Sequence, residues 1–74
     1  MKLIPIAVNQ TEVEISPKLT VFFSYKIPVA ALTDEGYIRT NKKWSMTTSR
    51  HINKWLNGAG AELVDQSVLD SLAA

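Results

Sequence analysis

The chain has 74 residues, no cysteine, one histidine and a formal net charge of +1. A chain of this length buries only about 60 to 65% of the surface that it exposes when unfolded. The absence of cysteine excludes disulfide scaffolds and cysteine-based zinc or iron–sulfur sites, and fits a reducing compartment. We therefore expect one small cytoplasmic domain over residues 1–74, for which a second copy of the chain is a natural source of added stability.

Charge is unevenly distributed along the chain. Residues 37–57 hold five basic residues and no acid, whereas residues 58–74 hold three acids and no base. A basic block is thus followed by an acidic tail. The basic block is the first candidate for a binding segment. The bases of the block are Arg39, Lys42, Lys43, Arg50 and Lys54, and the acids of the tail are Glu62, Asp65 and Asp70.

The first predicted strand lies within residues 2–8 and is largely apolar on both faces. Its apolar run is too short to span a bilayer, which takes about 20 residues. Pro5 interrupts the run, and no cleavage site of the signal-peptide type follows. Because proline lacks the amide that a central strand would need, we expect this strand at an edge of the sheet. A turn at residues 9–10 then leads to the second strand.

The next two predicted strands are joined by a proline-containing turn at residues 16–18. Residues 11–15 alternate apolar and acidic side chains, which is the period of a half-buried strand. Residues 19–25 are rich in β-branched and aromatic side chains and are the strongest strand candidate. Phe22 faces away from the other apolar side chains of that strand. Either this second face is partly covered, or Phe22 is offered to a partner.

A hairpin and two helices complete the predicted fold. After a break at residues 26–28, strands at 29–33 and 37–40 flank a three-residue loop whose Gly36 supplies a positive φ. A helix at residues 48–57 and a short helix at residues 65–73 follow, each with one apolar stripe. These stripes are Ile52, Trp55 and Leu56 in the first helix and Val68, Leu69 and Leu72 in the second.

One glycine and one aspartate mark the helix ends. Gly58 stands where a left-handed cap of the first helix is expected, and residues 58–60 read as a flexible joint. Asp65 is the expected N-cap of the second helix. The predicted fold class is therefore α+β, with an antiparallel β-meander of three to five strands within residues 2–41, a packed helix and a short C-terminal helix.

Residues 42–56 concentrate the side chains of chemical interest: both tryptophans, the only histidine, four bases and four hydroxyl groups. We expect one hydroxyl to cap the helix. Arg50 in the first turn would oppose the helix dipole and would repel Lys54 four residues later. A bound anion would relieve both costs, so a phosphate site at the helix start is one hypothesis.

A nucleic-acid backbone is the phosphate source that this segment favours. Trp44 is placed to stack on an exposed base beside the basic residues. The alternative is an ordinary solvated basic face, since the whole-chain pI of about 8.1 is lower than is usual for a nucleic-acid-binding domain. The residues of the nucleic-acid hypothesis are Arg39, Lys42, Lys43, Trp44, Thr47, Thr48, Ser49, Arg50 and Lys54.

The sequence contains no evident catalytic or metal-binding constellation. His51 has no cysteine and no second histidine as a companion ligand. Hydroxyl groups become nucleophiles only beside a base that the fold places correctly. We therefore expect His51 to be packed or hydrogen-bonded, and we expect no enzymatic activity, metal or cofactor.

Part of the chain resembles small proteins encoded by bacteriophages and other mobile elements. The resemblance covers about residues 21–56, through the pattern FSY-x-x-PVA, a glycine–tyrosine turn, a strand that ends in threonine, and the helix motif WS-x-TTSRHINKWL. Ile27 departs from it, because a small polar residue is expected there. The resemblance implies a phage or mobile-element origin and a hairpin followed by a helix, and it implies no reaction.

A phage origin adds two hypotheses to nucleic-acid binding. The first is an inhibitor or adaptor that binds a host protein in the host cytoplasm, with strand addition at a sheet edge as one mode of binding. Its contact surfaces would be the edge strand at residues 3–8, Phe22 and the apolar stripe of the second helix. The second is a homodimer, in which the partner is another copy of the chain. A membrane partner is not expected.

Overall fold

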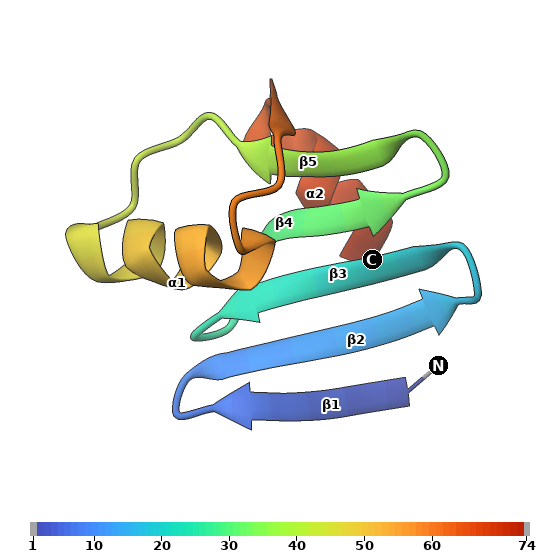
Figure 1. Cartoon of the computed structure of the whole chain (residues 1–74), viewed down its shortest axis with the longest axis horizontal. Helices are drawn as coiled ribbons and strands as arrows, with labels where there is room; N and C mark the ends of the chain where they lie inside the picture. The colour runs from blue at the N-terminus through green and yellow to red at the C-terminus, as the bar shows by residue number, and fades with distance from the viewer. Residues whose placement is uncertain (1, 74) are drawn as a thin grey trace.

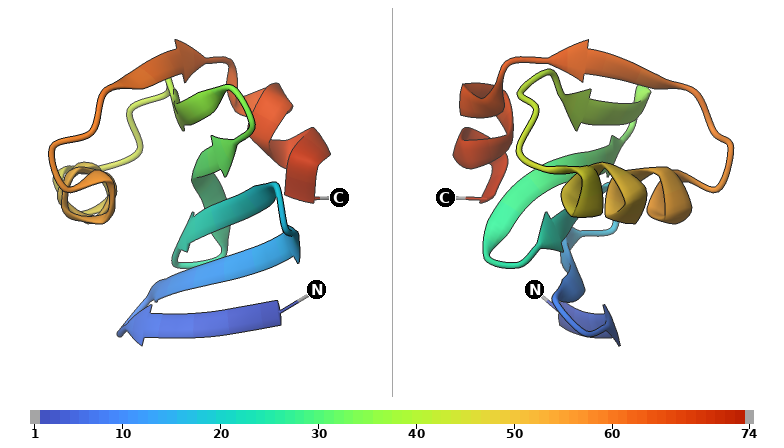
Figure 2. Two further views of the ribbon diagram at one scale, coloured as in Figure 1. Left: turned by 45° about the vertical axis from the view of Figure 1, so that its right-hand side comes forward. Right: turned by 90° about the vertical axis from the view of Figure 1, so that its left-hand side faces the viewer.

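The computed structural model describes residues 2–73, which form a six-stranded sheet with one helix on each face (Figures 1 and 2). The strands are β1 (Lys2–Ala7), β2 (Gln10–Ser16), β3 (Leu19–Ser24), β4 (Ile27–Thr33), β5 (Gly36–Thr40) and β6 (Ala61–Val64), and the helices are α1 (Met46–Leu56) and α2 (Gln66–Ala73). Strands β1 to β5 form an antiparallel meander in chain order, and β6 pairs parallel with β5. The predicted α+β fold, with its meander, packed helix and short C-terminal helix, is confirmed.

One face of the sheet is covered by α1. Phe22 of β3 pairs with Ala30 of β4, and both pack against Ile52 and Leu56 of the helix. Phe22 is fully buried there, which excludes its predicted alternative role as a surface offered to a partner. Small Ala30 lets the helix approach the sheet closely. The predicted packing of the helix through its apolar stripe is confirmed for these residues.

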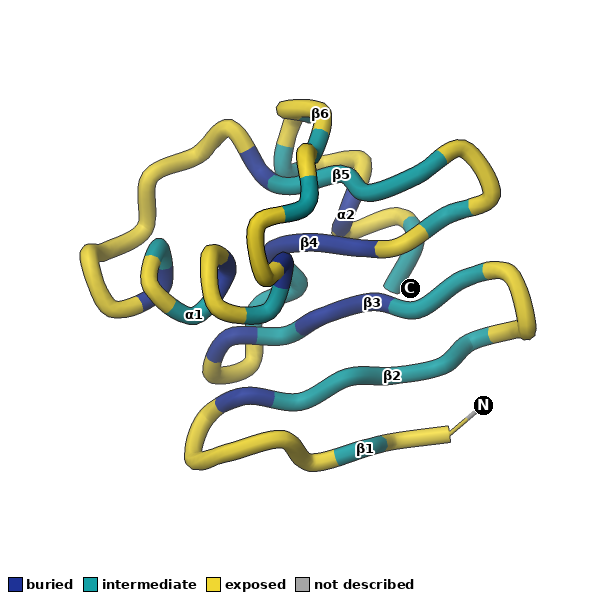
Figure 3. The backbone as a smooth tube through the Cα atoms, viewed as in Figure 1, coloured by how far each residue is buried: buried dark blue, intermediate teal, exposed yellow. Residues whose placement is uncertain are grey.

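The opposite face is covered by α2. Val21 and Ala31 are cross-strand partners, and both pack against Leu69. Because successive side chains of a strand point to opposite faces, neighbouring residues of β3 and β4 supply two separate cores. The buried centre of the sheet is therefore β3 and β4 (Figure 3). Leu69 is fully buried, so its predicted role as a contact surface for a host protein is wrong.

Strand β1 lies at the edge of the sheet, as its proline predicts. Pro5 lies opposite Thr11, and the register shifts between Pro5 and Ala7. Both helices lie over the other half of the sheet (Figure 1). Leu3 is therefore 67% exposed, and Val8, in the turn after β1, is 83% exposed.

The β4–β5 hairpin is tighter than predicted. Thr33 pairs directly with Gly36, so the loop consists of Asp34 and Glu35 alone. The Thr33 hydroxyl accepts a hydrogen bond from the Glu35 amide and donates one to the Gly36 carbonyl, which closes the turn without a third loop residue. Gly36 has a φ of 117°, the positive value expected of it.

The break predicted at residues 26–28 lies earlier in the chain. Tyr25 and Lys26 form the turn, with Tyr25 at a φ of 60°. Ile27 and Pro28 already belong to β4. The sheet accommodates Pro28 at an irregularity in the β3–β4 register, which is where proline is tolerated inside a sheet. Tyr25 consequently leaves the strand to which its sequence pattern assigned it.

Strand β6 was not predicted from the sequence. It has four residues, of which only Ala61 and Val64 are partly buried, so it is too short for a strand period to stand out. Parallel strands need a crossover connection, and α1 serves as the crossover between β5 and β6. Within residues 2–73, neither helix is long and apolar enough to cross a membrane.

Candidate nucleic-acid interface

Helix α1 begins with a serine cap. The Ser45 hydroxyl accepts a hydrogen bond from the Thr48 amide at 3.1 Å, and the Ser45 carbonyl accepts one from the Ser49 amide at 3.0 Å. Ser45 has an extended backbone, as an N-cap residue requires. The prediction that one hydroxyl of this run caps the helix is confirmed.

The prediction placed the start of this helix at residue 48, but the helix begins at Met46. Arg50 is therefore its fifth residue and lies beyond the first turn. Because the dipole effect falls off within the first turn, the predicted cost of a cation at the helix start does not apply to Arg50. The remaining local cost is the repulsion between Arg50 and Lys54, which are one turn apart.

The opposite end of α1 is closed by Asn57. Its backbone is left-handed, with a φ of 49°, and its amide donates to the Asn53 carbonyl at 3.1 Å. Gly58, the predicted cap, follows with a φ of 86°. Asparagine tolerates the left-handed conformation better than most residues, so the cap falls one residue before the glycine.

A buried polar network joins α1 to β3. Ser24 is 1% exposed, and its Oγ lies 2.8 Å from His51 Nδ1 and donates to Thr48 Oγ1 at 3.3 Å. Thr48 Oγ1 also accepts a hydrogen bond from the Ser45 hydroxyl at 3.3 Å. His51 is thus hydrogen-bonded, as its position in the sequence led us to expect.

The network determines whether the hydroxyl groups of Ser24 and Thr48 could act as nucleophiles or contact a ligand. A serine at hydrogen-bonding distance from a histidine is the first requirement of a nucleophilic pair. Ser24, however, is buried and shares its hydroxyl between His51 and Thr48. Thr48 is 5% exposed. Both hydroxyl groups therefore hold the helix to the sheet, and Thr48 does not present a hydroxyl to a ligand.

Trp55 is part of the α1 core. Its ring stacks on Phe22 with centroids 5.0 Å apart, and it meets Tyr37 edge-on at 5.6 Å. Its Nε1 donates a hydrogen bond to Glu12 of β2 at 2.7 Å. The indole therefore fastens α1 to three strands, which is the core role predicted for it.

Trp44 is held from two sides. Its Nε1 donates to Oε1 of Gln66 at 3.1 Å, and Lys42 Nζ lies 4.1 Å from the ring centroid. Gln66, the first residue of α2, also donates through Nε2 to the Pro28 carbonyl at 2.7 Å. The indole is 37% exposed. A base could stack on the ring face that Lys42 occupies only by displacing this cation.

Arg39 links β5 to α1. One terminal nitrogen of its guanidinium donates to Oδ1 of Asn53 at 3.0 Å, and its buried Nε has no hydrogen-bond partner among the described residues. Lys54 lies on the other flank of the helix, where it lines a cavity of about 460 Å³ beside β1. Arg39 and Lys54 are thus on opposite flanks of α1.

The predicted interface residues surround α1 without converging on one point. Thr48 is buried, Arg39 and Ser49 are partly buried, and the remaining six are exposed. Sequence reasoning missed three side chains that position this surface, because each contacts a residue at least 14 positions away in the chain. Those three are Glu12, which contacts Trp55; Asn53, which contacts Arg39; and Gln66, which contacts Trp44.

The comparisons with known proteins bear on the family and leave the chemistry open. The model of a family of unknown function, DUF8033, matches residues 1–71. The chain belongs to this family. The match takes in β1, β2 and most of α2, so it extends well beyond the 21–56 segment that carries the sequence resemblance. No curated protein and no solved structure matches the chain.

Proposed function

We propose that this protein is a non-catalytic accessory protein that binds nucleic acid through the cationic surface around α1. The supporting observation is the charge of α1 and of the segment before it. From residue 42 to residue 56 there are four basic residues and no acid, and all four are exposed. With Arg39, the cationic surface consists of Arg39, Lys42, Lys43, Arg50 and Lys54.

The arrangement fits a polyanion better than a single bound phosphate. The Ser45 and Thr48 hydroxyls are already engaged in hydrogen bonds within the chain, and the basic residues are distributed around the helix. A nucleic-acid backbone carries charges at regular intervals and can contact such a surface at several points. Trp44 and the hydroxyls of Thr47 and Ser49 border this surface, so they complete the proposed interface.

Binding to labelled single- and double-stranded DNA and RNA, measured by fluorescence anisotropy at two salt concentrations, tests the proposal. We expect affinity to fall as salt rises, because each neutralised phosphate releases counterions. Arg50→Ala should lower the slope of log K against log salt by about 0.9 on duplex DNA if one contact is lost. Arg50→Glu should abolish binding.

Lys18→Glu is the matched control. Lys18 lies in the exposed β2–β3 turn, away from α1, and the substitution changes the net charge by the same amount as Arg50→Glu. It should leave most of the affinity intact. Absence of binding to every nucleic acid at low salt, or equal losses in the two variants, would overturn the proposal.

A second candidate function is binding to a partner protein through β1 and the turn that follows it. Leu3 is 67%, Ile6 45% and Val8 83% exposed, all at one edge of the sheet. Strand addition is disfavoured there, because Pro5 lacks an amide and the register shifts after it. Contact through side chains fits better. With a phage or mobile-element origin, the partner would be a protein of the host cytoplasm.

Val8→Asp tests this second function. A tagged protein should lose a specific partner from nuclease-treated host lysate when Val8 is charged. Leu63→Asp is the control, because Leu63 is similarly apolar and 64% exposed on β6 at the other edge. Charges at Phe22 or Leu69 are unsuitable, since both side chains are fully buried. A dimer mass in light scattering that Val8→Asp reduces to a monomer would assign the edge to a second copy.

A further inference from the structure

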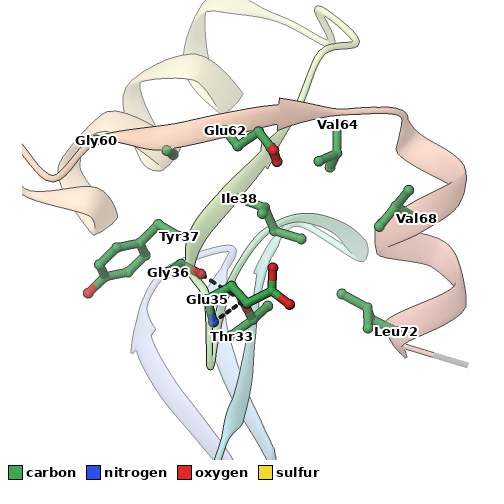
Figure 4. A pocket seen from close by; sticks show the side chains of 11 residues that line it. Thr33, Glu35, Gly36, Tyr37, Ile38, Gly60, Glu62, Val64, Val68 and Leu72 are labelled. Carbon is green, nitrogen blue, oxygen red and sulfur yellow. Dashed lines mark hydrogen bonds between the residues drawn. The ribbon is translucent and has the colours of Figure 1, made fainter.

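A groove opens on the side of the sheet away from α1, between β5, β6 and α2 (Figure 4). Its volume is about 620 Å³. The β4–β5 turn and Gly60 border the groove as well. The wall on one side is the sheet, and the wall on the other side is α2. The aliphatic side chains that line these walls are Ile38 and Val64 from the sheet and Val68 and Leu72 from the helix.

The aliphatic walls are open because α2 turns only part of its apolar stripe towards the sheet. Leu69 is fully buried, whereas Val68 on the same helix is 42% exposed. Ile38, Val64 and Leu72 are half-buried. The groove therefore presents connected apolar surface that the fold itself leaves uncovered.

Two carboxylates stand on the rim of the groove. Glu35 comes from the β4–β5 turn and Glu62 from β6, and both side chains lie beside Ile38 (Figure 4). Within residues 2–73, neither carboxylate has a hydrogen-bond or ion-pair partner, and the lining contains no lysine or arginine.

The other acids near α2 are engaged. The Asp65 carboxylate accepts hydrogen bonds from Ser67, and the Asp70 carboxylate accepts one from Gln66. Glu35 and Glu62 are therefore the carboxylates that remain available at this groove. Their charge disfavours a polyanion at the groove and favours a cationic group.

We propose that the groove is a docking site for a protein segment in which lysine or arginine alternates with aliphatic side chains. The aliphatic side chains would pack on Val68 and Leu72, and the cations would meet Glu35 and Glu62 at the rim. This assignment rests on charge complementarity combined with uncovered apolar surface. It is independent of the proposed nucleic-acid function, because it uses the opposite face of the sheet.

Titration of isotope-labelled protein with a short lysine–leucine peptide, followed by NMR, tests the docking site. We expect chemical shifts to move at Gly36, Ile38, Glu62 and Val68, and the amide shifts of Arg50 and Lys54 on α1 to stay constant. A peptide with glutamate in place of lysine, and one with serine in place of leucine, should each fail to bind. These peptide controls use the unmodified protein, so they do not depend on any variant folding.

Removing the two carboxylate charges at the rim is a second test of the docking site. The double variant Glu35→Gln, Glu62→Gln should weaken the lysine–leucine peptide roughly fivefold to tenfold, since exposed ion pairs each contribute modestly. Asp34→Asn is the matched control, because Asp34 neighbours Glu35 in the same turn but does not line the groove. It should leave peptide affinity unchanged.

Three results would overturn the docking site. Shifts confined to α1 would place the peptide on the wrong face, and equal binding of the glutamate peptide would remove the charge argument. Shifts at the groove that grow with protein concentration in the absence of peptide, together with a dimer mass, would show that a second copy occupies it.

Discussion

The two faces of the sheet differ in how firmly they hold their helices. Helix α1 has 11 residues, a side-chain cap at its start and a left-handed cap at its end. Aromatic stacking, the Trp55–Glu12 hydrogen bond and the Ser24–Thr48–His51 network tie it to the sheet. Helix α2 has eight residues and a single buried side chain, Leu69. The same two central strands thus support one helix held by aromatic stacking and a buried polar network, and one helix held mainly by Leu69 and by the hydrogen bonds of Gln66.

The faces also differ in charge. Helix α1 carries Arg50 and Lys54 and no acid, whereas α2 carries Asp70 and no base. In a chain of 74 residues, the sheet therefore separates a cationic surface from an acidic one. Both proposals rest on this separation, one for a polyanion on the α1 side and one for a cationic segment on the α2 side. The following predictions test whether the two faces are as unequal as their contacts indicate.

The largest expected effect is at the α1 core. Phe22→Ala should lower the free energy of unfolding by about 3 to 5 kcal/mol, because it removes a fully buried ring. A core of this size rarely contributes more than about 3 to 5 kcal/mol in total, so the variant should be largely unfolded by circular dichroism. Phe23→Ala is the control, because the neighbouring ring is half-buried on the α2 face and should cost less. A Phe22→Ala protein with an unchanged urea midpoint would contradict the importance of this core.

A smaller loss is expected at the α2 core. Leu69→Ala should cost about 2 to 3 kcal/mol, near the low end for a buried leucine, because a helix of eight residues with one buried side chain can relax around the cavity. Hydrogen exchange should then rise throughout α2 while the amides of Ile52 and Leu56 stay protected. Val68→Ala, at a 42% exposed site, is the control. Equal acceleration in both helices would mean that the two faces unfold as one unit.

The cap of α1 should have a moderate effect. Ser45→Ala should cost about 1 kcal/mol, because the Thr48 amide loses its acceptor. Thr47→Ala removes a neighbouring exposed hydroxyl that makes no cap, and should change stability by less than about 0.5 kcal/mol. Urea denaturation measures both. Equal effects would show that the hydroxyl run acts collectively rather than through Ser45.

The smallest effect is expected at the start of α2, and it depends on pH. Hydrogen bonds from the Ser67 hydroxyl and amide lower the pKa of Asp65 below its ordinary value of 3.8. A lowered pKa in the folded state stabilises the protein above pH 3.8, and this contribution disappears as the pH falls through the folded-state pKa.

Asp65→Asn removes that pH-dependent contribution while keeping an N-cap side chain. The variant should melt slightly below the unmodified protein at neutral pH, and the difference should vanish in acid. Asp70→Asn removes the same charge from the same region and controls for net charge. A difference in melting temperature that persists in strong acid would show that the Asp65 carboxylate acts through something other than its ionised form.

Local patterns predicted much of the α1 side. The spacing of Ile52 and Leu56 predicted the helix, and the hydroxyl run predicted that one of its members caps it. The true start at Met46 was missed, because a helix extends to the residue whose side chain caps it rather than to the first apolar position. That shift of one half-turn removed the dipole argument for Arg50, since the dipole acts only over the first turn.

The candidate interface was predictable in composition but not in arrangement. The basic block was visible in the sequence, yet nothing local indicated that Thr48 would be buried or that Lys42 would lie on Trp44. The groove beside α2 could not be foreseen either, because β6 has too few residues for a strand period. Val68 and Leu69 are neighbours in the chain, and only their packing makes one a wall of the groove and the other a core residue.

The sequence by itself determined the features that depend on neighbours in the chain: the alternation of the strands, Pro5 at an edge, the turn at Gly36 and the separation of basic from acidic segments. Tertiary structure decided which residues meet across the sheet, including the parallel pairing of β6 with β5 and the burial of Phe22. The physical reason is distance along the chain. A strand period or a helix cap is set within a few residues, whereas two helices divide the faces of one sheet only after the whole chain has packed.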